Sequence, residues 1–365
     1  MLGTITVVRQ ARNRSHRGSV CVLRPLERCA SIGQRDLRVA RRVSRRMVDI
    51  TRKFGTLMGL DHIGVGVSDI GESLPFYADL GFTDVAFDYS GPLPGLQTVT
   101  GHGETEARVV YLRTANPTVL GRASIKLVQL LDRTSPAKPE GQAWGEPGIC
   151  EVCVHVNGQA AFYRDLVARG RTGIMEPNEA DLPPYETHCG LSYVEDPDGA
   201  KIELIEWSTL EAGWPHPAGL PQGVNHVAFG VTDIDRTKAF YQSLGFTGQL
   251  FESSGYFEPM HPWFGTRTPP SMRMMLLTTP FGGALEPVQH TPASPDMRGE
   301  WGHLGTFEFG IGARSLDIAI DHLVSLGVKL LGEPAALDLG GGGTWRYAYF
   351  QDPDELFVCV TEVRA

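Results

Sequence analysis

Histidine and carboxylate side chains recur at matching places in this 365-residue chain. His62 and His226 open two similar segments, and Glu286 and Glu308 interrupt two otherwise apolar stretches. A carboxylate seldom faces a protein core without a partner, so each glutamate either faces solvent or meets a partner such as a metal ion. Histidine and carboxylate groups are common zinc ligands, which favours a metal site. Packed or surface histidines are the alternative interpretation.

An internal repeat surrounds these residues. The segment that starts at His62 matches the segment that starts at His226, and a Phe-Tyr-x-x-Leu-Gly-Phe-Thr motif starts at Phe76 and again at Phe240. Both matches have the same offset of 164 residues. An Asp-Pro-Asp motif near the end of each half, at Asp196 and Asp352, makes a third match. Matches in the same order predict two halves with the same fold.

Each half divides again into two units. Residues 151–156 precede a stretch with helical spacing of apolar residues over 159–169, and Gly170 follows where a helix would end. Residues 308–311 precede a similar stretch over 315–326. We therefore predict four strand–helix–three-strand units, near residues 59–132, 148–207, 223–290 and 304–362. This is an α+β fold of four βαβββ units in one chain.

Pairing of the units would create the site. A single unit leaves the concave face of its sheet open, whereas two paired units close into a cleft, where inward side chains of the first and last strands converge. We predict that the units pair within each half, giving domains at 57–210 and 223–365 joined by a linker at 211–222. Pairing across the middle of the chain stays open.

The first 56 residues are expected to lie outside this fold and to be disordered. They have no hydrophobic periodicity and a net charge of +11, against about −20 for the remainder. A start codon placed too early, with Met47 or Met58 as the true start, is the favoured interpretation, and a transit peptide is the alternative.

Composition excludes several classes of protein. An acidic body lacks the basic patch of a nucleic-acid-binding protein, and no apolar run is long enough to cross a membrane. The six cysteines are scattered, which indicates a reducing cytoplasm instead of a disulfide framework. Cys150 and Cys153 form a C-x-x-C on an expected strand, where side chains three apart face opposite sides.

The motifs resemble the vicinal oxygen chelate superfamily, which includes glyoxalase I, methylmalonyl-CoA epimerase, extradiol dioxygenases and bleomycin-resistance proteins. The resemblance covers residues 59–362 and rests on Asp61-His62-Ile63, on the Phe-Tyr helices and on the motif at Asp196. It implies two glyoxalase-like half-barrel domains. It also implies metal ligands on the first and last strands of paired units.

Residue by residue, the resemblance implies two alternative ligand sets. The favoured set, in the second half, is His226, Glu286 and Glu308, with Cys359 where a glutamate is usual. Cys359 as a small buried apolar residue is the alternative interpretation. The second set, in the first half, is His62, Glu151 and Glu203. There Lys126 stands where a glutamate is usual, which suggests a site without metal.

The resemblance implies one divalent metal, with zinc favoured over iron, manganese, cobalt or nickel, acting as a Lewis acid on a substrate with adjacent oxygens. We predict a metal-dependent isomerase or epimerase for a small polyhydroxy ketone, such as the C7 cyclitol 2-epi-5-epi-valiolone. Glu252 is predicted as the general base, with a solvated surface carboxylate as the alternative. His261 lies in an aromatic, proline-rich segment that is predicted to cover the substrate.

Two other functions stay open. An extradiol dioxygenase would need a facial triad of two histidines and one carboxylate for Fe(II), which the predicted ligands do not supply. A binding protein of the bleomycin-resistance type would need a cleft but no metal. In either case the partner is a small molecule, without nucleic acid or membrane, and a homodimer is compatible with the sequence.

Overall fold

The computed structural model describes residues 57–114, 123–182, 187–207, 221–256, 260 and 271–364. These residues form two eight-stranded sheets. The strands of one sheet, in spatial order, are β14 (Ala335–Asp338), β15 (Thr344–Gln351), β16 (Phe357–Arg364), β13 (Gly305–Ala313), β1 (Leu57–Gly66), β4 (Ser124–Leu130), β3 (Glu106–Arg113) and β2 (Asp84–Pro92). Those of the other are β10 (Gly248–Gly255), β11 (Ser271–Thr278), β12 (Ala284–Thr291), β9 (Pro221–Gly230), β5 (Gly148–Val156), β8 (Lys201–Trp207), β7 (Thr187–Glu195) and β6 (Thr172–Leu182).

Each unit contributes four neighbouring strands to a sheet, which confirms the predicted βαβββ organisation. The first strand of a unit runs parallel to its last strand, as β1 does to β4, and the remaining strands follow antiparallel. The helices are α2 (Ile70–Asp79), α3 (Gln97–Thr100), α4 (Gln159–Ala168), α5 (Ile234–Ser243) and α7 (Leu316–Ser325), with a short 3₁₀ turn η2 (Gly340–Gly342).

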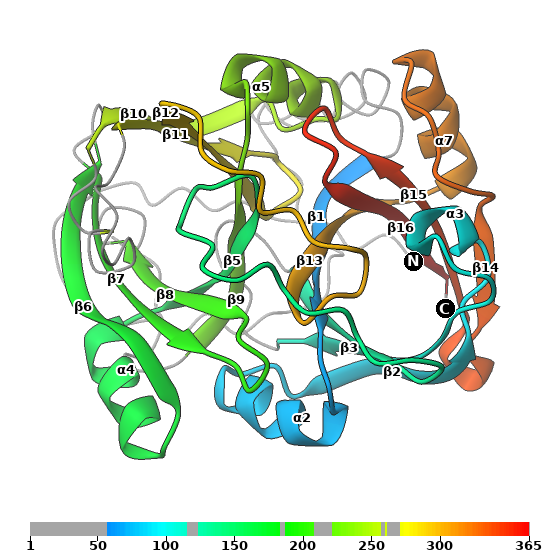
Figure 1. The fold of residues 1–365 in the computed structure, drawn as a ribbon, viewed down its shortest axis with the longest axis horizontal. Helices are drawn as coiled ribbons and strands as arrows, with labels where there is room; N and C mark the ends of the chain where they lie inside the picture. The colour runs from blue at the N-terminus through cyan, green and yellow to red at the C-terminus, as the bar shows by residue number, and fades with distance from the viewer. Residues whose placement is uncertain are drawn as a thin grey trace, which may run out of the picture. The chain divides into compact units, whose positions relative to one another are not determined.

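The units pair across the middle of the chain, not within each half. β1 of the first unit pairs antiparallel with β13 of the fourth, and β5 of the second unit pairs antiparallel with β9 of the third. Figure 1 shows the result: blue and cyan strands share a sheet with orange and red ones, and green strands share one with yellow. The predicted pairing within 57–210 and 223–365 is therefore wrong. In addition, β9 begins at Pro221, inside the predicted linker.

In each half of the chain, one hydrogen bond of the same kind links the two sheets. The Tyr77 hydroxyl on α2 donates to Asp196 (3.0 Å), and the Tyr241 hydroxyl on α5 donates to Asp352 (2.7 Å). Each tyrosine belongs to one unit of a half and each aspartate to the other. The residues of the repeated motifs therefore form contacts between the two sheets. Within each sheet, by contrast, the paired strands come from different halves of the chain.

The first strands of the units are almost wholly buried, because one face packs in the main hydrophobic core and the other faces the concave side of the sheet. Val152 and Val227 lie in that core, in register with one another. Since side chains alternate along a strand, the residues next to each of these valines point to the concave side of the sheet. The histidine and glutamate side chains of the candidate site lie on that side.

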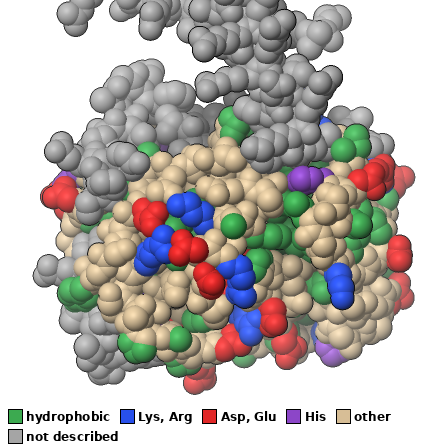
Figure 2. Space-filling model, turned by 90° about the horizontal axis from the view of Figure 1, so that it is seen from above, with side chains coloured by type: hydrophobic (Ala, Val, Ile, Leu, Met, Phe, Trp, Pro, Cys, Tyr) green, Lys and Arg blue, Asp and Glu red, His purple; other side chains and the backbone are tan. Residues whose placement is uncertain are grey.

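Acidic and basic side chains are interspersed on one face of the described residues. On the face drawn in Figure 2, Lys and Arg side chains lie beside Asp and Glu side chains. Arg236 pairs with Asp354 (2.9 Å) and Arg298 with Asp296 (2.7 Å). Within the described ranges, no helix is long and apolar enough to cross a bilayer.

Candidate metal centre

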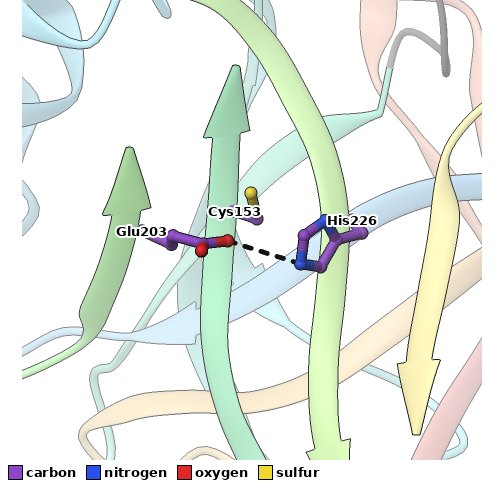
Figure 3. Close-up of side chains that lie close together, drawn as sticks. All are labelled: Cys153, Glu203 and His226. Carbon is purple, nitrogen blue, oxygen red and sulfur yellow. Dashed lines mark ion pairs between the residues drawn. The ribbon is translucent and has the colours of Figure 1, made fainter. Parts of the chain in front are cut away.

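Four acid or imidazole side chains from four neighbouring strands converge on the concave side of the second sheet. His226 lies on β9, Glu286 on β12, Glu151 on β5 and Glu203 on β8. From His226 Nε2, the nearest carboxylate oxygen of Glu286 lies at 2.8 Å, that of Glu203 at 3.4 Å and that of Glu151 at 3.7 Å. Figure 3 shows Glu203 and His226 turned toward one another. All four residues are buried.

Neighbouring groups orient two of the four. The Nδ1 atom of His226 lies 2.9 Å from Oδ1 of Asn225. A carbonyl oxygen can only accept, so Nδ1 carries the proton and a neutral ring presents the Nε2 lone pair to the centre. The Trp144 indole N–H donates to Oε2 of Glu151 (2.9 Å), which leaves Oε1 to face His226. Such bonds hold metal ligands in position.

The centre carries a surplus of negative charge. Burial and the nearby Glu151 carboxylate together raise the pKa of Glu203 to about 8. Burial also raises the pKa of Glu151. Burial alone would lower the pKa of His226, but the carboxylates around it, led by Glu286, raise it to about 10. Together these shifts indicate that the buried carboxylates of the centre outnumber the cations beside them.

Several polar atoms of the centre have no hydrogen-bond partner and could bind a divalent cation. His226 Nε2, Glu151 Oε1 and Glu203 Oε2 are buried without a hydrogen-bond partner. Ligand atoms of Glu151, His226 and Glu286 lie within 4.8 Å of one another, as do those of Cys153, Glu203 and His226. Buried charges of this kind are normally paired or bound to metal. One imidazole with carboxylates is a ligand set that zinc accepts.

A cavity opens beside the centre. It is narrow, since the centre of a water molecule can occupy only about 20 Å³ of it. Glu203, His226 and Glu286 form its polar end, and none of the other described lining residues is charged. Those residues are mostly apolar or aromatic: Trp144, Leu182, Cys189, Leu191, Tyr193, Ile205, Trp207, Phe251, Met260 and Met274. A few convergent polar groups at one end of an apolar cavity are typical of a small-molecule site.

The equivalent positions of the first sheet hold a lysine in place of a metal. Lys126 on β4 forms a buried ion pair with Glu308 on β13, and His62 Nε2 lies 3.5 Å from the same carboxylate. Lys126 Nζ also donates to the Tyr349 hydroxyl (3.1 Å) and lies 5.4 Å from the centre of the Trp345 ring. Burial alone would raise the pKa of Glu308, but Lys126 and His62 lower it to about 2.

Each of the two predicted ligand sets is divided between the two sheets. The structure keeps His226 and Glu286 together but places Glu308 in the other sheet, and it separates His62 from Glu151 and Glu203. The physical reason is the pairing of units across the chain, which combines one ligand pair from each predicted set. Lys126 consequently faces Glu308, not the two carboxylates of the first half.

Of the two predicted catalytic residues, Glu252 is described and does not face the centre. Glu252 on β10 accepts hydrogen bonds from Arg273 (2.8 Å) and Lys238 (3.3 Å), which lowers its pKa despite partial burial. Its neighbour Phe251 is the residue that faces the cavity, so Glu252 points to the opposite side of the strand and the predicted base is wrong. His261 lies outside the described residues.

The expected arrangement of the C-x-x-C is also wrong. A register irregularity between Ile149 and Glu151 marks a bulge in β5. Cys150 and Cys153 consequently pack in the same hydrophobic cluster instead of facing opposite sides. Both are free thiols.

Sequence reasoning missed the indole groups that hold the glutamates. Trp301 donates to Glu308 (2.9 Å) as Trp144 does to Glu151. A W-G-x-x-G-x-x-E pattern begins at both tryptophans. This repeated spacing was the available signal.

We expect Trp144→Phe to weaken zinc binding by about 10- to 100-fold, because loss of a bond that orients a ligand typically has an effect of that size. Competition against a chromophoric chelator measures the affinity. Trp301→Phe is the matched control, because it removes the same bond in the first sheet and should leave the affinity unchanged. Equal losses in both variants would contradict a role specific to Glu151.

The family model for the Glyoxalase/Bleomycin resistance protein/Dioxygenase superfamily matches residues 59–204 and 223–360. A mutant of glyoxalase I from Zea mays aligns with 15% identity and a TM-score of 0.55, covering 87% of this chain and 96% of that one. A putative dioxygenase from Bacillus subtilis aligns with 13% identity and a TM-score of 0.51, covering 85% and 86%. These likenesses concern the fold alone. No curated protein sequence matches the chain.

Proposed function

Because the chain belongs to the glyoxalase, bleomycin-resistance and dioxygenase superfamily, we propose that it is a metal-dependent isomerase or epimerase. It would move a proton next to a carbonyl group of a small substrate with adjacent oxygens. One observation carries the proposal: two carboxylates, Glu203 and Glu286, line the same cavity from strands that lie on opposite sides of the central pair β9 and β5.

His226, Glu286 and Glu151 would hold the cation, and Glu203 would lie beside it. When bound, a divalent ion supplies Lewis-acid chemistry, since it polarises a carbonyl and stabilises negative charge on the adjacent oxygens. Zinc is the preferred ion because imidazole and carboxylate groups suit it.

We assign the two proton transfers to the carboxylates that line the cavity. Oε2 of Glu203 is buried without a hydrogen-bond partner, so it is free to accept a proton from the substrate carbon. Glu286 faces the cavity from the other side of His226 and would return a proton to the opposite face of that carbon. Removal from one face and return to the other inverts the carbon, which is epimerisation.

The cavity lining narrows the substrate class. Apolar and aromatic side chains dominate its wall, and few described groups there could bind a set of hydroxyls. The lining therefore favours a hydroxy ketone with an apolar or aryl substituent. A C7 cyclitol such as 2-epi-5-epi-valiolone fits this wall less well.

The two alternative functions, an extradiol dioxygenase and a non-catalytic binding protein, require different residues at the centre. An extradiol dioxygenase uses two histidines and one carboxylate, whereas the described residues at this centre supply one histidine and three carboxylates. A non-catalytic binding protein would use the same apolar cavity but would exchange no proton.

Proton exchange in D₂O tests the proposal. We expect the zinc-loaded protein to incorporate deuterium at the C–H beside the carbonyl of an aryl or alkyl hydroxy ketone, as followed by proton NMR. Glu203→Gln should slow the exchange by at least about 100-fold, the usual contribution of a general base. Glu252→Gln is the matched control, since its carboxylate faces away from the cavity, and it should exchange at the wild-type rate.

Two outcomes would count against this function. Ketone binding without any exchange would favour the binding protein. Oxygen consumption with a catechol would favour the dioxygenase.

A further inference from the structure

Cys153 occupies a position from which its sulfur reaches the same centre. It lies on β5 in register with His226 of β9 on one side and with Glu203 of β8 on the other. Figure 3 shows it on the middle strand, between these two side chains. The sulfur, a Glu203 oxygen and a His226 nitrogen lie within 4.8 Å of one another. A tetrahedral zinc ion with bonds of about 2.0–2.3 Å would draw its ligand atoms to about 3.3–3.8 Å from one another.

The environment of Cys153 points to a ligand beyond ordinary core packing. The thiol is fully buried, and the two polar atoms beside it, Glu203 Oε2 and His226 Nε2, are buried without hydrogen-bond partners. Glu151, two residues earlier on the same strand, faces the same centre. The sulfur therefore adjoins unsatisfied donor atoms that a cation would satisfy.

The first sheet gives a natural comparison. The residue equivalent to Cys153 is Gly310, which pairs in register with His62 as Cys153 does with His226. A Cβ atom at Gly310 would lie only 2.1 Å from the His62 ring, so that sheet has no room for a side chain there. The first sheet thus has no side chain at the position of Cys153, and its thiol, Cys359, lies instead on β16 in register with Gly310.

Two overlapping ligand groups follow, and they share His226. One contains oxygen and nitrogen alone, from Glu151, His226 and Glu286, and the other adds the sulfur of Cys153 with Glu203. Thiolate ligands favour zinc over manganese or magnesium, which prefer oxygen.

We propose that Cys153 is a thiolate ligand of the metal and gives the centre a preference for zinc-like ions. This inference rests on the metal site of the proposed function. As the metal–sulfur bond forms, the thiol proton passes to solvent. With a hard ion such as Mn²⁺ the sulfur stays uncoordinated.

Cobalt spectroscopy of the full-length protein tests the ligand directly. Co²⁺ substitutes for zinc, and a cobalt–thiolate bond produces a near-ultraviolet charge-transfer band that oxygen and nitrogen ligands do not give. We expect this band in the wild type, its loss in Cys153→Ala, and its retention in Cys189→Ala and Cys359→Ala. Cys189 controls for the thiol that lines the cavity, and Cys359 controls for the thiol of the first sheet.

Metal affinities give a second readout. Cys153→Ala should weaken Zn²⁺ binding by at least about tenfold, an effect of the size seen when metal-site support is lost, while the Mn²⁺ affinity stays unchanged. X-ray absorption of the wild-type zinc protein should show one sulfur at about 2.3 Å, which tests the ligand even if the variant fails to fold.

The outcomes separate this inference from the proposed function. Visible cobalt bands without the charge-transfer band, or a band that persists in Cys153→Ala, would overturn the thiolate ligand and leave the metal site standing. Failure of the wild type to bind cobalt or zinc at all would overturn both. A thiol that merely donates a hydrogen bond to Glu203 gives no charge-transfer band.

Discussion

His226→Ala is expected to abolish the binding of a divalent cation, whereas His62→Ala is expected to leave it intact. The wild-type protein should retain about one equivalent of zinc after dialysis, because one imidazole and three carboxylates surround a single centre. His226 Nε2 faces all three carboxylates of that centre, so its removal leaves carboxylates that repel one another. Elemental analysis of the purified proteins gives the metal content.

His62 is a matched control because it has the equivalent place on β1 and a similar set of contacts. It is buried, its Nδ1 lies 2.9 Å from Asp61, and its Nε2 faces Glu308. Circular dichroism should accompany both measurements, so that a loss of metal is not confused with unfolding. Loss of metal in His62→Ala alone would place the centre in the first sheet, and wild-type protein without metal affinity would remove the basis for Lewis-acid chemistry.

Lys126→Met is expected to lower the free energy of unfolding by about 3–5 kcal/mol, the usual effect of removing one partner of a buried ion pair. Lys126 and Glu308 are both almost fully buried, and the ammonium takes the place that a metal would have in the first sheet. Without it, the Glu308 carboxylate is left buried with His62 as its remaining cationic neighbour. Urea unfolding in the presence of a chelator measures the change without interference from the metal centre.

The effect should depend on pH in a defined direction. Lys126 and His62 lower the pKa of Glu308 to about 2 in the folded protein, compared with 4.5 as its ordinary value. A carboxylate with a lowered pKa contributes stability that is fully present above pH 4.5 and is lost as the pH falls toward 2. The wild type should therefore lose stability across this interval more steeply than Lys126→Met.

A double variant provides the control for this pair. Lys126→Met combined with Glu308→Leu removes both charges, and apolar replacements of a buried ion pair are often neutral or stabilising. It should therefore recover most of the stability that Lys126→Met loses. A single variant as stable as the wild type would contradict a structural role for the lysine.

Several features of the site could be predicted from the sequence because they depend on local pattern. The repeated segments at His62 and His226 identify the opening strands of two units, and the strand period assigns their side chains to one face. Glu286 and Glu203 follow as inward residues of closing strands. Lys126 was recognisable as a cation among potential ligands. Each of these assignments needs a strand and its register, which the order of residues specifies.

Other features depend on packing that no local pattern records. Glu252 was expected at the cleft, but Arg273 and Lys238 hold it on the opposite side of β10. The bulge in β5 brings Cys150 and Cys153 into one cluster against the strand period. In both cases neighbouring elements decide the direction of a side chain.

The amino-acid sequence alone predicts four units of one kind and identifies the histidine and glutamate side chains on their first and last strands that point inward. The tertiary structure decided which units share a sheet, and hence which inward side chains meet. Strands pair through backbone groups that are the same in every unit, so the sequence of one edge carries little information about its partner. Packing of the whole chain joined β5 to β9 and β1 to β13. This pairing of strands places His226 beside Glu151 and Glu203, and it places Glu308 beside Lys126.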